Sequence, residues 1–426
     1  MIGVPTASNE RRVWLRVGAL LDGTGGPPLR DAHIVYDARG ILFVGGPNDL
    51  PPASALNPAQ TTADAVLPEH TLLPGLIEAH AHLFLEGGEL DPEKRATYLK
   101  QTPEALLAAA RTRLAPLVRL GIAAVRDAGD RDGVGLALSR LYRSDDRPLM
   151  PYFDSPGAAI HRKGRYGGFM ADAVENHPSL RTCVETRIKG GADRIKLIPT
   201  GIINFKQGRV TAEPQFTTEE VAELVAAARA HGKQTFAHAS GDMGIDRAID
   251  AGVDSIEHGF FLRDDQLAKL RDRGIAWVPT FAPVQAQVDH ADMMGWDTTV
   301  VSHLRRIVDQ HAATLVRAHN LGVQIIAGSD AGSYGVPHGL GFLTELELME
   351  RAGMPAGAVL AAATGNSAKR LAFGEKFGRI TPGYLSRFVL TRYSPLVTVA
   401  NLRRDRTIVF DGAVFETQEN AKMEGL

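Results

Sequence analysis

The chain has 426 residues, of which 44% are hydrophobic and 23% are charged, a composition typical of a folded protein with a large core. Its formal net charge of −2 at pH 7 gives no electrostatic reason to expect binding to nucleic acid or to an anionic membrane surface. A single cysteine, Cys183, excludes an intrachain disulfide and fits a reducing compartment. Residues 1–13 lack the apolar core of a secretory signal, and no uninterrupted apolar run reaches the roughly 18 residues that span a bilayer. We therefore expect a cytoplasmic protein.

Both ends of the chain show short β-like patterns. Between residues 13 and 65, short runs rich in β-branched and aromatic residues are separated by Gly, Asn and Pro turns, and similar runs return at residues 388–391 and 407–410. We predict that residues 1–70 and 376–426 together form one small β-sandwich domain.

The middle of the chain alternates short apolar runs with helical segments, which is typical of βα units around a parallel sheet. One helix is expected to begin at Thr102-Pro103 and end at Gly121, and another begins with a capping box between Thr217 and Glu220. Eight such units close naturally into a (β/α)8 TIM barrel, which we predict for residues 71–375. The candidate strands are residues 72–77, 122–127, 149–154, 194–198, 234–241, 254–259, 276–281 and 323–330.

Potential metal ligands lie at the ends of several predicted strands. His80 and His82 follow the first apolar run, and because they are two residues apart their side chains point to one face of a strand. His238, His258 and Asp330 each end a later run. Reactive groups of a TIM barrel gather at the carboxyl ends of its strands, so we expect these five side chains to meet.

Several motifs, in the same order along the chain, resemble those of the amidohydrolase superfamily of metal-dependent hydrolases, and most closely its prolidase-like and imidazolonepropionase-like branch. These motifs are residues 74–82 (PGLIEAHAH), 191–196 (GADRIK), the runs around His238 and His258, 328–330 (GSD) and 378–383 (GRITPG). The resemblance extends over nearly the whole chain. It implies a TIM barrel beside a small β-sandwich built from both chain ends, in agreement with the patterns above.

The resemblance also implies a centre of two divalent metal ions. His80, His82 and Asp330 would hold one ion, and His238 and His258 would hold the other. Lys196, placed after the fourth strand, would be carboxylated by carbon dioxide, and its carbamate would bridge both ions together with a hydroxide. Imidazole and carboxylate ligands suit Zn²⁺ best, with Mn²⁺, Co²⁺ and Fe²⁺ as other suitable ions.

The activity implied by this resemblance is cleavage of an amide-type C–N bond by attack of the metal-bridging hydroxide. Asp330 would accept the proton of the water and return it to the leaving amine. The expected small-molecule substrate is a dipeptide, an N-acyl amino acid or a carbamate. The sequence does not identify which of these is the substrate. It also leaves open whether the protein forms a homo-oligomer.

Two other interpretations use the same residues differently. A mononuclear deaminase or cyclic-amide hydrolase would need His80, His82, His238 and Asp330, but not Lys196. Deaminases of this superfamily usually carry a glutamate three residues after the strand-five histidine, where this chain has Gly241. A catalytically silent barrel is the third interpretation, although such relatives typically lose metal ligands and here none is missing.

Three residues in loops are candidates for contact with the substrate. His161 and Tyr166, after the third strand, could reach the scissile carbonyl or a substrate carboxylate, or could merely be solvated. His338, which follows Asp330 in the chain, lines the pocket or serves a structural role. The segment 200–209 has the length and glycines of an active-site loop, and its Lys206 or Arg209 could pair with an anionic substrate.

Overall fold

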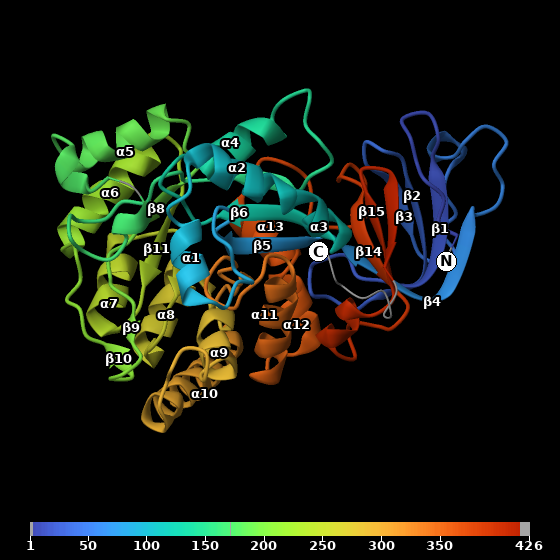
Figure 1. Cartoon of the computed structure of the whole chain (residues 1–426). Helices are drawn as coiled ribbons and strands as arrows, with labels where there is room; N and C mark the ends of the chain where they lie inside the picture. Colours follow the sequence, from blue (N-terminus) through green and yellow to red (C-terminus); the bar gives the residue numbers. More distant parts are fainter. Residues whose placement is uncertain (1–2, 171, 418–426) are drawn as a thin grey trace.

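The computed structural model describes residues 3–170 and 172–417, which form a barrel surrounded by helices and, beside it, a β-rich terminal domain (Figure 1). No helix within these described residues is both long enough and apolar enough to cross a membrane.

The β-rich terminal domain contains one seven-stranded sheet made from both chain ends. Its strands, in spatial order, are β16 (Ala413–Thr417), β15 (Arg406–Phe410), β14 (Arg387–Thr391), β4 (Ala65–Pro74), β1 (Val13–Leu20), β2 (Leu29–Tyr36) and β3 (Ile41–Gly45). The antiparallel pairing of β14 with β4 joins the C-terminal strands to the N-terminal ones. Buried side chains from both groups, such as Leu15, Ile34 and Phe388, share one hydrophobic cluster. The prediction of a β domain formed by both ends is therefore confirmed.

The barrel is a ring of parallel strands. Seven regular strands form two sheets: β5 (Leu76–Ala81), β6 (Ile122–Asp127) and β7 (Tyr152–Asp154) in one, and β8 (Ile195–Leu197), β11 (Thr235–Ala239), β12 (Ser255–His258) and β13 (Ala276–Val278) in the other. Residues 323–331 occupy the eighth position. Three parallel bridges complete the ring: Ile160 with Leu197, Trp277 with Ile325, and Ala81 with Ala331. This arrangement confirms the predicted TIM barrel.

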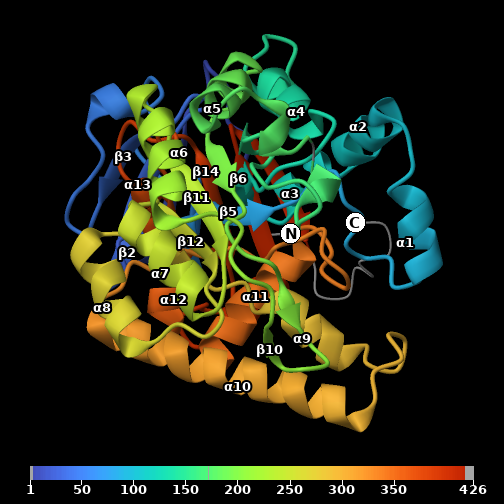
Figure 2. The same ribbon diagram turned by 90° about the vertical axis from the view of Figure 1, so that its left-hand side faces the viewer.

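Helices surround the ring of strands (Figure 2). They are α1 (Pro92–Tyr98), α2 (Pro103–Thr112), α3 (Leu114–Arg119), α4 (Val134–Tyr142), α5 (Leu180–Lys189), α6 (Thr218–Ala230), α7 (Asp242–Ala251), α8 (Asp264–Arg273), α9 (Ala282–Asp289), α10 (Thr298–Leu321), α11 (Leu340–Arg351), α12 (Ala356–Ala362) and α13 (Gly365–Leu371). The segment after β8 forms a short hairpin, β9 (Ile203–Asn204) and β10 (Arg209–Val210). Ile203 of β9 shares a hydrophobic cluster with Val284 of α9, and Figure 2 shows β10 beside α9.

The structure confirms one local prediction and refines two others. The capping box at Thr217 is present at the start of α6. The helix expected from Pro103 to Gly121 is instead two helices, α2 and α3, because Pro116 has no N–H to continue the helical hydrogen bonds across their junction.

The first apolar run, expected as one strand, is divided between the two parts of the molecule. Its residues up to Pro74 belong to β4, and β5 begins at Leu76. A Cβ on the intervening Gly75 would lie 2.7 Å from the Cβ of Ala123 in β6. Only glycine therefore allows the chain to pass this close to β6.

Candidate active site

All six side chains singled out as metal ligands line one cavity at the carboxyl end of the barrel. The cavity has a volume of about 240 Å³. The six residues come from five strands or the turns that follow them: His80 and His82 from β5, Lys196 from β8, His238 from β11, His258 from β12, and Asp330 from the eighth position. Because parallel strands bring their carboxyl ends to one rim, residues up to 250 positions apart become neighbours.

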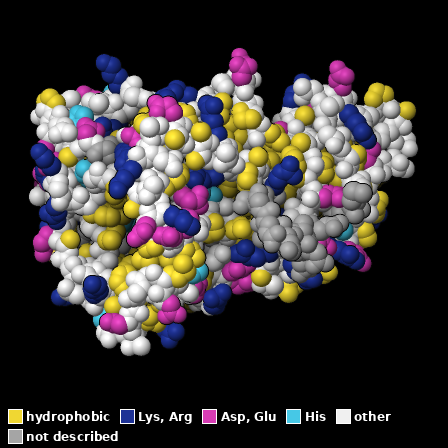
Figure 3. All heavy atoms as spheres, viewed as in Figure 1, with side chains coloured by type: hydrophobic (Ala, Val, Ile, Leu, Met, Phe, Trp, Pro, Cys, Tyr) yellow, Lys and Arg dark blue, Asp and Glu magenta, His cyan; other side chains and the backbone are white. Residues whose placement is uncertain are grey.

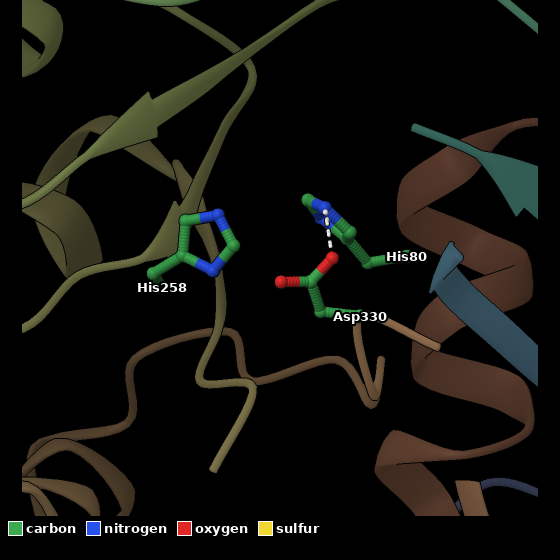
Figure 4. A group of neighbouring side chains, drawn as sticks. All are labelled: His80, His258 and Asp330. Carbon is green, nitrogen blue, oxygen red and sulfur yellow. Dashed lines mark ion pairs between the residues drawn. The ribbon is translucent and has the colours of Figure 1, made fainter. Parts of the chain in front are cut away.

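The carboxylate of Asp330 lies against the first pair of histidines. Its Oδ1 is 3.6 Å from His80 Nε2 and 3.4 Å from His82 Nε2. Figure 4 shows His80 and Asp330 pointing toward each other, with His258 facing them. Ligand atoms of these three residues all lie within 4.8 Å of one another, which is close enough to hold one metal ion. The ring centre of His238 is 4.5 Å from that of His258, so the fourth imidazole adjoins this group.

The Nδ1 atoms of His80 and His82 each lie against an oxygen atom that acts as a hydrogen-bond acceptor. His80 Nδ1 lies 2.5 Å from Glu257 Oε2, and His82 Nδ1 lies 2.8 Å from the carbonyl oxygen of Gly129. Each Nδ1 must therefore donate its hydrogen. This tautomer, assigned from the hydrogen bonds, leaves the Nε2 lone pair of both rings free for a metal ion.

The second pair of histidines is oriented by its own partners. His258 Nδ1 is 2.8 Å from Thr280 Oγ1, which itself donates to the carbonyl oxygen of Pro279 and so accepts from the ring. Because Nδ1 of His258 donates this hydrogen bond, the lone pair on its Nε2 is free. His238 has the opposite orientation, because its Nε2 lies 3.4 Å from the carbonyl oxygen of Gly201, which leaves the Nδ1 lone pair free.

Burial keeps these imidazoles uncharged. Desolvation, reinforced by the nearby Lys196 ammonium, lowers the pKa of both His82 and His238 to about 3. Desolvation also moves the pKa of His80 and of His258 well below the usual value. Metal ions bind neutral imidazole, so all four rings have the protonation state that ligation requires at neutral pH.

Lys196 and His80 carry polar atoms that the described residues leave unsatisfied. Lys196 is 2% exposed, and its Nζ, like His80 Nε2, is buried with no hydrogen-bond partner among the residues the structure describes. Burial lowers the pKa of Lys196 to about 8. Such orphaned atoms are rare in folded proteins unless a bound group completes the site. The donor set thus fits divalent metal ions.

Behind the imidazoles lies a buried charged network. Glu257 holds His80 and also accepts from Arg126 Nη2 at 2.8 Å and from Ser255 Oγ at 2.6 Å. Arg126 and Glu257 are 1% and 0% exposed. Neither residue was predicted from the sequence, although a charged residue within an apolar strand is itself a signal that a buried partner exists.

Glu257→Gln is expected to lower the free energy of unfolding by about 3–5 kcal/mol, because it leaves the Arg126 guanidinium buried without its counter-charge. Urea denaturation of the metal-free proteins at pH 7 measures this loss.

Glu78→Gln is the matched control for this substitution. Burial raises the pKa of Glu78 to about 8, so its carboxyl group is mostly protonated at pH 7, and glutamine can replace its hydrogen bonds to Ser329. We expect a loss of about 1 kcal/mol or less. Equal losses in the two variants would contradict the role given to the Glu257 charge.

Three non-glycine residues at the site have a left-handed backbone. The φ angles are 67° at His258, 50° at Thr280 and 56° at Asp330. This conformation is unfavourable for residues with a Cβ and persists where the surrounding structure holds it, often at functional sites. These residues mark turns of the backbone at the carboxyl end of β12, after β13 and at the end of the eighth segment of the barrel.

The three loop candidates have different surroundings. Tyr166 lines the cavity, and its ring centre is 5.1 Å from that of His238. His161 lies outside the cavity lining, with Nδ1 3.0 Å from the carbonyl oxygen of Arg162. His338 also lies outside it and bonds the carbonyl oxygen of Leu85 at 2.8 Å. Contact of His161 or His338 with a substrate therefore remains a prediction.

The barrel and the polar residues at its strand ends agree with the family resemblance of the sequence, and the comparison with protein families establishes the class. Residues 71–414 match the Amidohydrolase family, to which the chain belongs. It is a hydrolase acting on carbon–nitrogen bonds. The superfamily is metal-dependent, and His80, His258 and Asp330 form a group that could hold a metal ion.

Known proteins resemble the chain over most of its length. Ochratoxinase of Aspergillus niger is 25% identical over 433 aligned residues, which cover 95% of this chain and 86% of that protein. An uncharacterised protein of Mycobacterium bovis is 28% identical over 303 residues, covering 71% of this chain and 74% of that one. Among solved structures, a Xaa-Pro dipeptidase with methionine bound in its active site is similar with a TM-score of 0.78 and 26% identity, over 95% of this chain and 100% of that one.

Proposed function

We propose that this protein is a binuclear metal-dependent amidohydrolase that cleaves an amide-type C–N bond in a small molecule. The observation that carries this proposal is the convergence of four neutral imidazoles, one carboxylate and one unpartnered buried amine in a single cavity. A mononuclear centre needs only part of this set, and it leaves the buried Lys196 without a role.

The ligand atoms divide between two ions. His80 Nε2, His82 Nε2 and Asp330 would hold the first ion, and His238 Nδ1 and His258 Nε2 would hold the second. Lys196, converted to a carbamate by carbon dioxide, would supply one oxygen to each. When bound, two divalent cations, most suitably Zn²⁺, lower the pKa of water and polarise a carbonyl group.

The protein's own side chains contribute proton handling and orientation. Burial raises the pKa of Asp330 to about 7, although Lys196 opposes this change, so its carboxyl group can both accept and return a proton near neutral pH. Tyr166 lies near enough to Asp330 for that carboxylate to raise the phenol pKa further, beyond the larger effect of burial. Its hydroxyl remains protonated and can donate to the carbonyl oxygen of a substrate.

Two of the similar proteins support an amide or peptide bond as the target. One is named a Xaa-Pro dipeptidase and the other an ochratoxinase. The proposal for this chain extends no further than the bond type: a dipeptide, an N-acyl amino acid or a carbamate each presents such a bond.

Metal content and hydrolysis, measured together, test the proposal. Protein purified without chelator should contain close to two divalent ions per chain, and it should hydrolyse members of a panel of amides, dipeptides and carbamates. Chelation should abolish this activity, and Zn²⁺ should restore it. One ion per chain at full activity would instead indicate a mononuclear enzyme. Full occupancy without turnover of any amide, ester or lactone would indicate a catalytically silent barrel.

A further inference from the structure

The cavity has a polar floor and apolar walls. The floor consists of the six candidate ligands described above. One wall comes from the loop that follows β7, where Met170 packs with Ile198 and Tyr166 in a small hydrophobic cluster. Phe169, beside it, lines the cavity and contacts the ring of Tyr166 with 5.7 Å between ring centres.

A second wall is also apolar and is anchored to the barrel. Ile203 of β9, Phe260 and Val284 of α9 line the cavity and belong to one hydrophobic cluster. Phe205 lines the cavity as well, and its ring packs edge-on against Trp296. The β9–β10 hairpin is therefore held on the body of the protein by its apolar side chains.

Large hydrophobic side chains remain exposed where these walls reach the surface. Phe169 is 40% exposed and Ile202 is 50% exposed, and both line the cavity. Figure 3 shows hydrophobic side chains gathered on the surface over the region of α9. An exposed apolar rim around a concave site is typical of a site that receives apolar ligands.

The polar side chains in the walls are uncharged. Gln287 and Ser333 line the cavity, and the hydroxyl group of Tyr334 is buried there without a hydrogen-bond partner among the described residues. Of the lysines, arginines, aspartates and glutamates in the part of the chain that the structure describes, only Lys196 and Asp330 line the cavity, and both belong to its floor.

Cations near the cavity have other partners. Arg95 donates to the carbonyl oxygens of Glu86 and Gly332, and its guanidinium lies over the ring of Tyr334, 5.9 Å from the ring centre. Arg162 pairs with Glu175 and Glu220. Lys206 and Arg209, considered above as partners for an anionic substrate, do not line the cavity, whereas the hairpin residues that do line it are apolar.

We propose that the cavity selects uncharged amides or carbamates with apolar groups on both sides of the scissile bond, and that it disfavours substrates with a free carboxylate. This inference rests on the proposed function and specifies its substrate class. A carboxylate lying against these walls, away from the floor, would lose its hydration without gaining a cationic side chain in return, which is costly. An apolar group would instead bury its surface against Phe169, Phe205 and Phe260.

Three matched compounds test this selection: N-benzoyl-phenylalanine, its primary amide N-benzoyl-phenylalaninamide, and N-benzoyl-2-phenylethylamine. All three release benzoate when the benzoyl amide is cleaved, and only the first carries a carboxylate. We expect kcat/KM for benzoate release to be at least about tenfold higher for both uncharged compounds. An equal or higher value for the acid would overturn the inference.

Binding of the same compounds, measured by isothermal titration calorimetry on the metal-loaded protein, separates this inference from the proposed function. If no compound is hydrolysed but the two uncharged ones bind more tightly than the acid, the proposed amide hydrolysis fails and the charge selection stands. If the uncharged compounds do not bind more tightly, the charge selection fails.

A cation added to the rim should shift the preference. Ile202→Arg places a guanidinium on the exposed part of the cavity lining and should raise the acid-to-amide ratio of kcat/KM about two- to fivefold. Val397→Arg is the matched control, because Val397 is 80% exposed and lies outside the cavity lining. An unchanged ratio in Ile202→Arg, or an equal rise in the control, would count against the inference.

Discussion

Asp330→Asn is expected to lower kcat by about 10²–10⁴-fold, because an amide cannot accept and return the proton that the carboxylate carries. Asp330 is well placed for this role, since its Oδ1 lies 3.6 Å from His80 Nε2 and 3.4 Å from His82 Nε2, within the group of candidate metal ligands. Asparagine has nearly the same shape, so the fold should persist. Steady-state kinetics at saturating metal concentration, with circular dichroism to check folding, provide the measurement.

Asp297→Asn is the matched control for this experiment. Asp297 caps the first turn of α10 by accepting from the backbone N–H of Val300, and asparagine caps a helix equally well. This control should keep the kcat of the original protein. If Asp330→Asn retained more than about a tenth of kcat at full metal occupancy, Asp330 would not be the proton carrier.

Lys196→Ala is expected to remove most of the bound metal and almost all activity. The side chain is buried, with Nζ 4.7 Å from the ring centre of Phe236, and the proposed carbamate on it would join the two ions. Elemental analysis before and after extensive dialysis measures the loss, with the exposed Lys189→Ala as control. A Lys196→Ala protein that retains two ions per chain would contradict a bridging role for this residue.

The carbamate itself has a separate signature. Because burial lowers the pKa of Lys196 to about 8, roughly a tenth of its amine groups are uncharged at pH 7 and able to react with carbon dioxide. Metal-free protein should therefore recover activity faster when Zn²⁺ is added with bicarbonate than when Zn²⁺ is added alone in carbon dioxide-depleted buffer. Equal recovery in both buffers would favour an unmodified lysine.

Much of the architecture could be predicted because local patterns carry it. The alternation of apolar runs with helical segments indicated the barrel, and the capping box at Thr217 marked the start of α6 correctly. Boundaries were less predictable. The run 72–77 reads as one strand, but its two halves join different sheets, and the difference depends on contacts with Arg387 and Ala123 that lie far away in the sequence.

The four histidines and Asp330 could be recognised from the sequence because each stands at the end of an apolar run, whereas Lys196 was identified through the family resemblance. The orientation of these side chains could not be recognised in the same way. Whether a ring presents Nε2 or Nδ1 depends on which acceptor lies behind it, and those acceptors, such as Glu257 for His80 and Gly201 for His238, come from other strands and loops.

By itself, the sequence determined the fold class, the family resemblance and the six residues at the strand ends, because periodicity and residue type are local properties. The tertiary structure alone decided how those residues face one another, which charges support them and what surrounds the substrate. The walls of the cavity show why: Phe169, Ile203 and Phe260 are ordinary hydrophobic residues in the sequence. They become a binding surface only when the packing of three separate segments leaves an unfilled space between them.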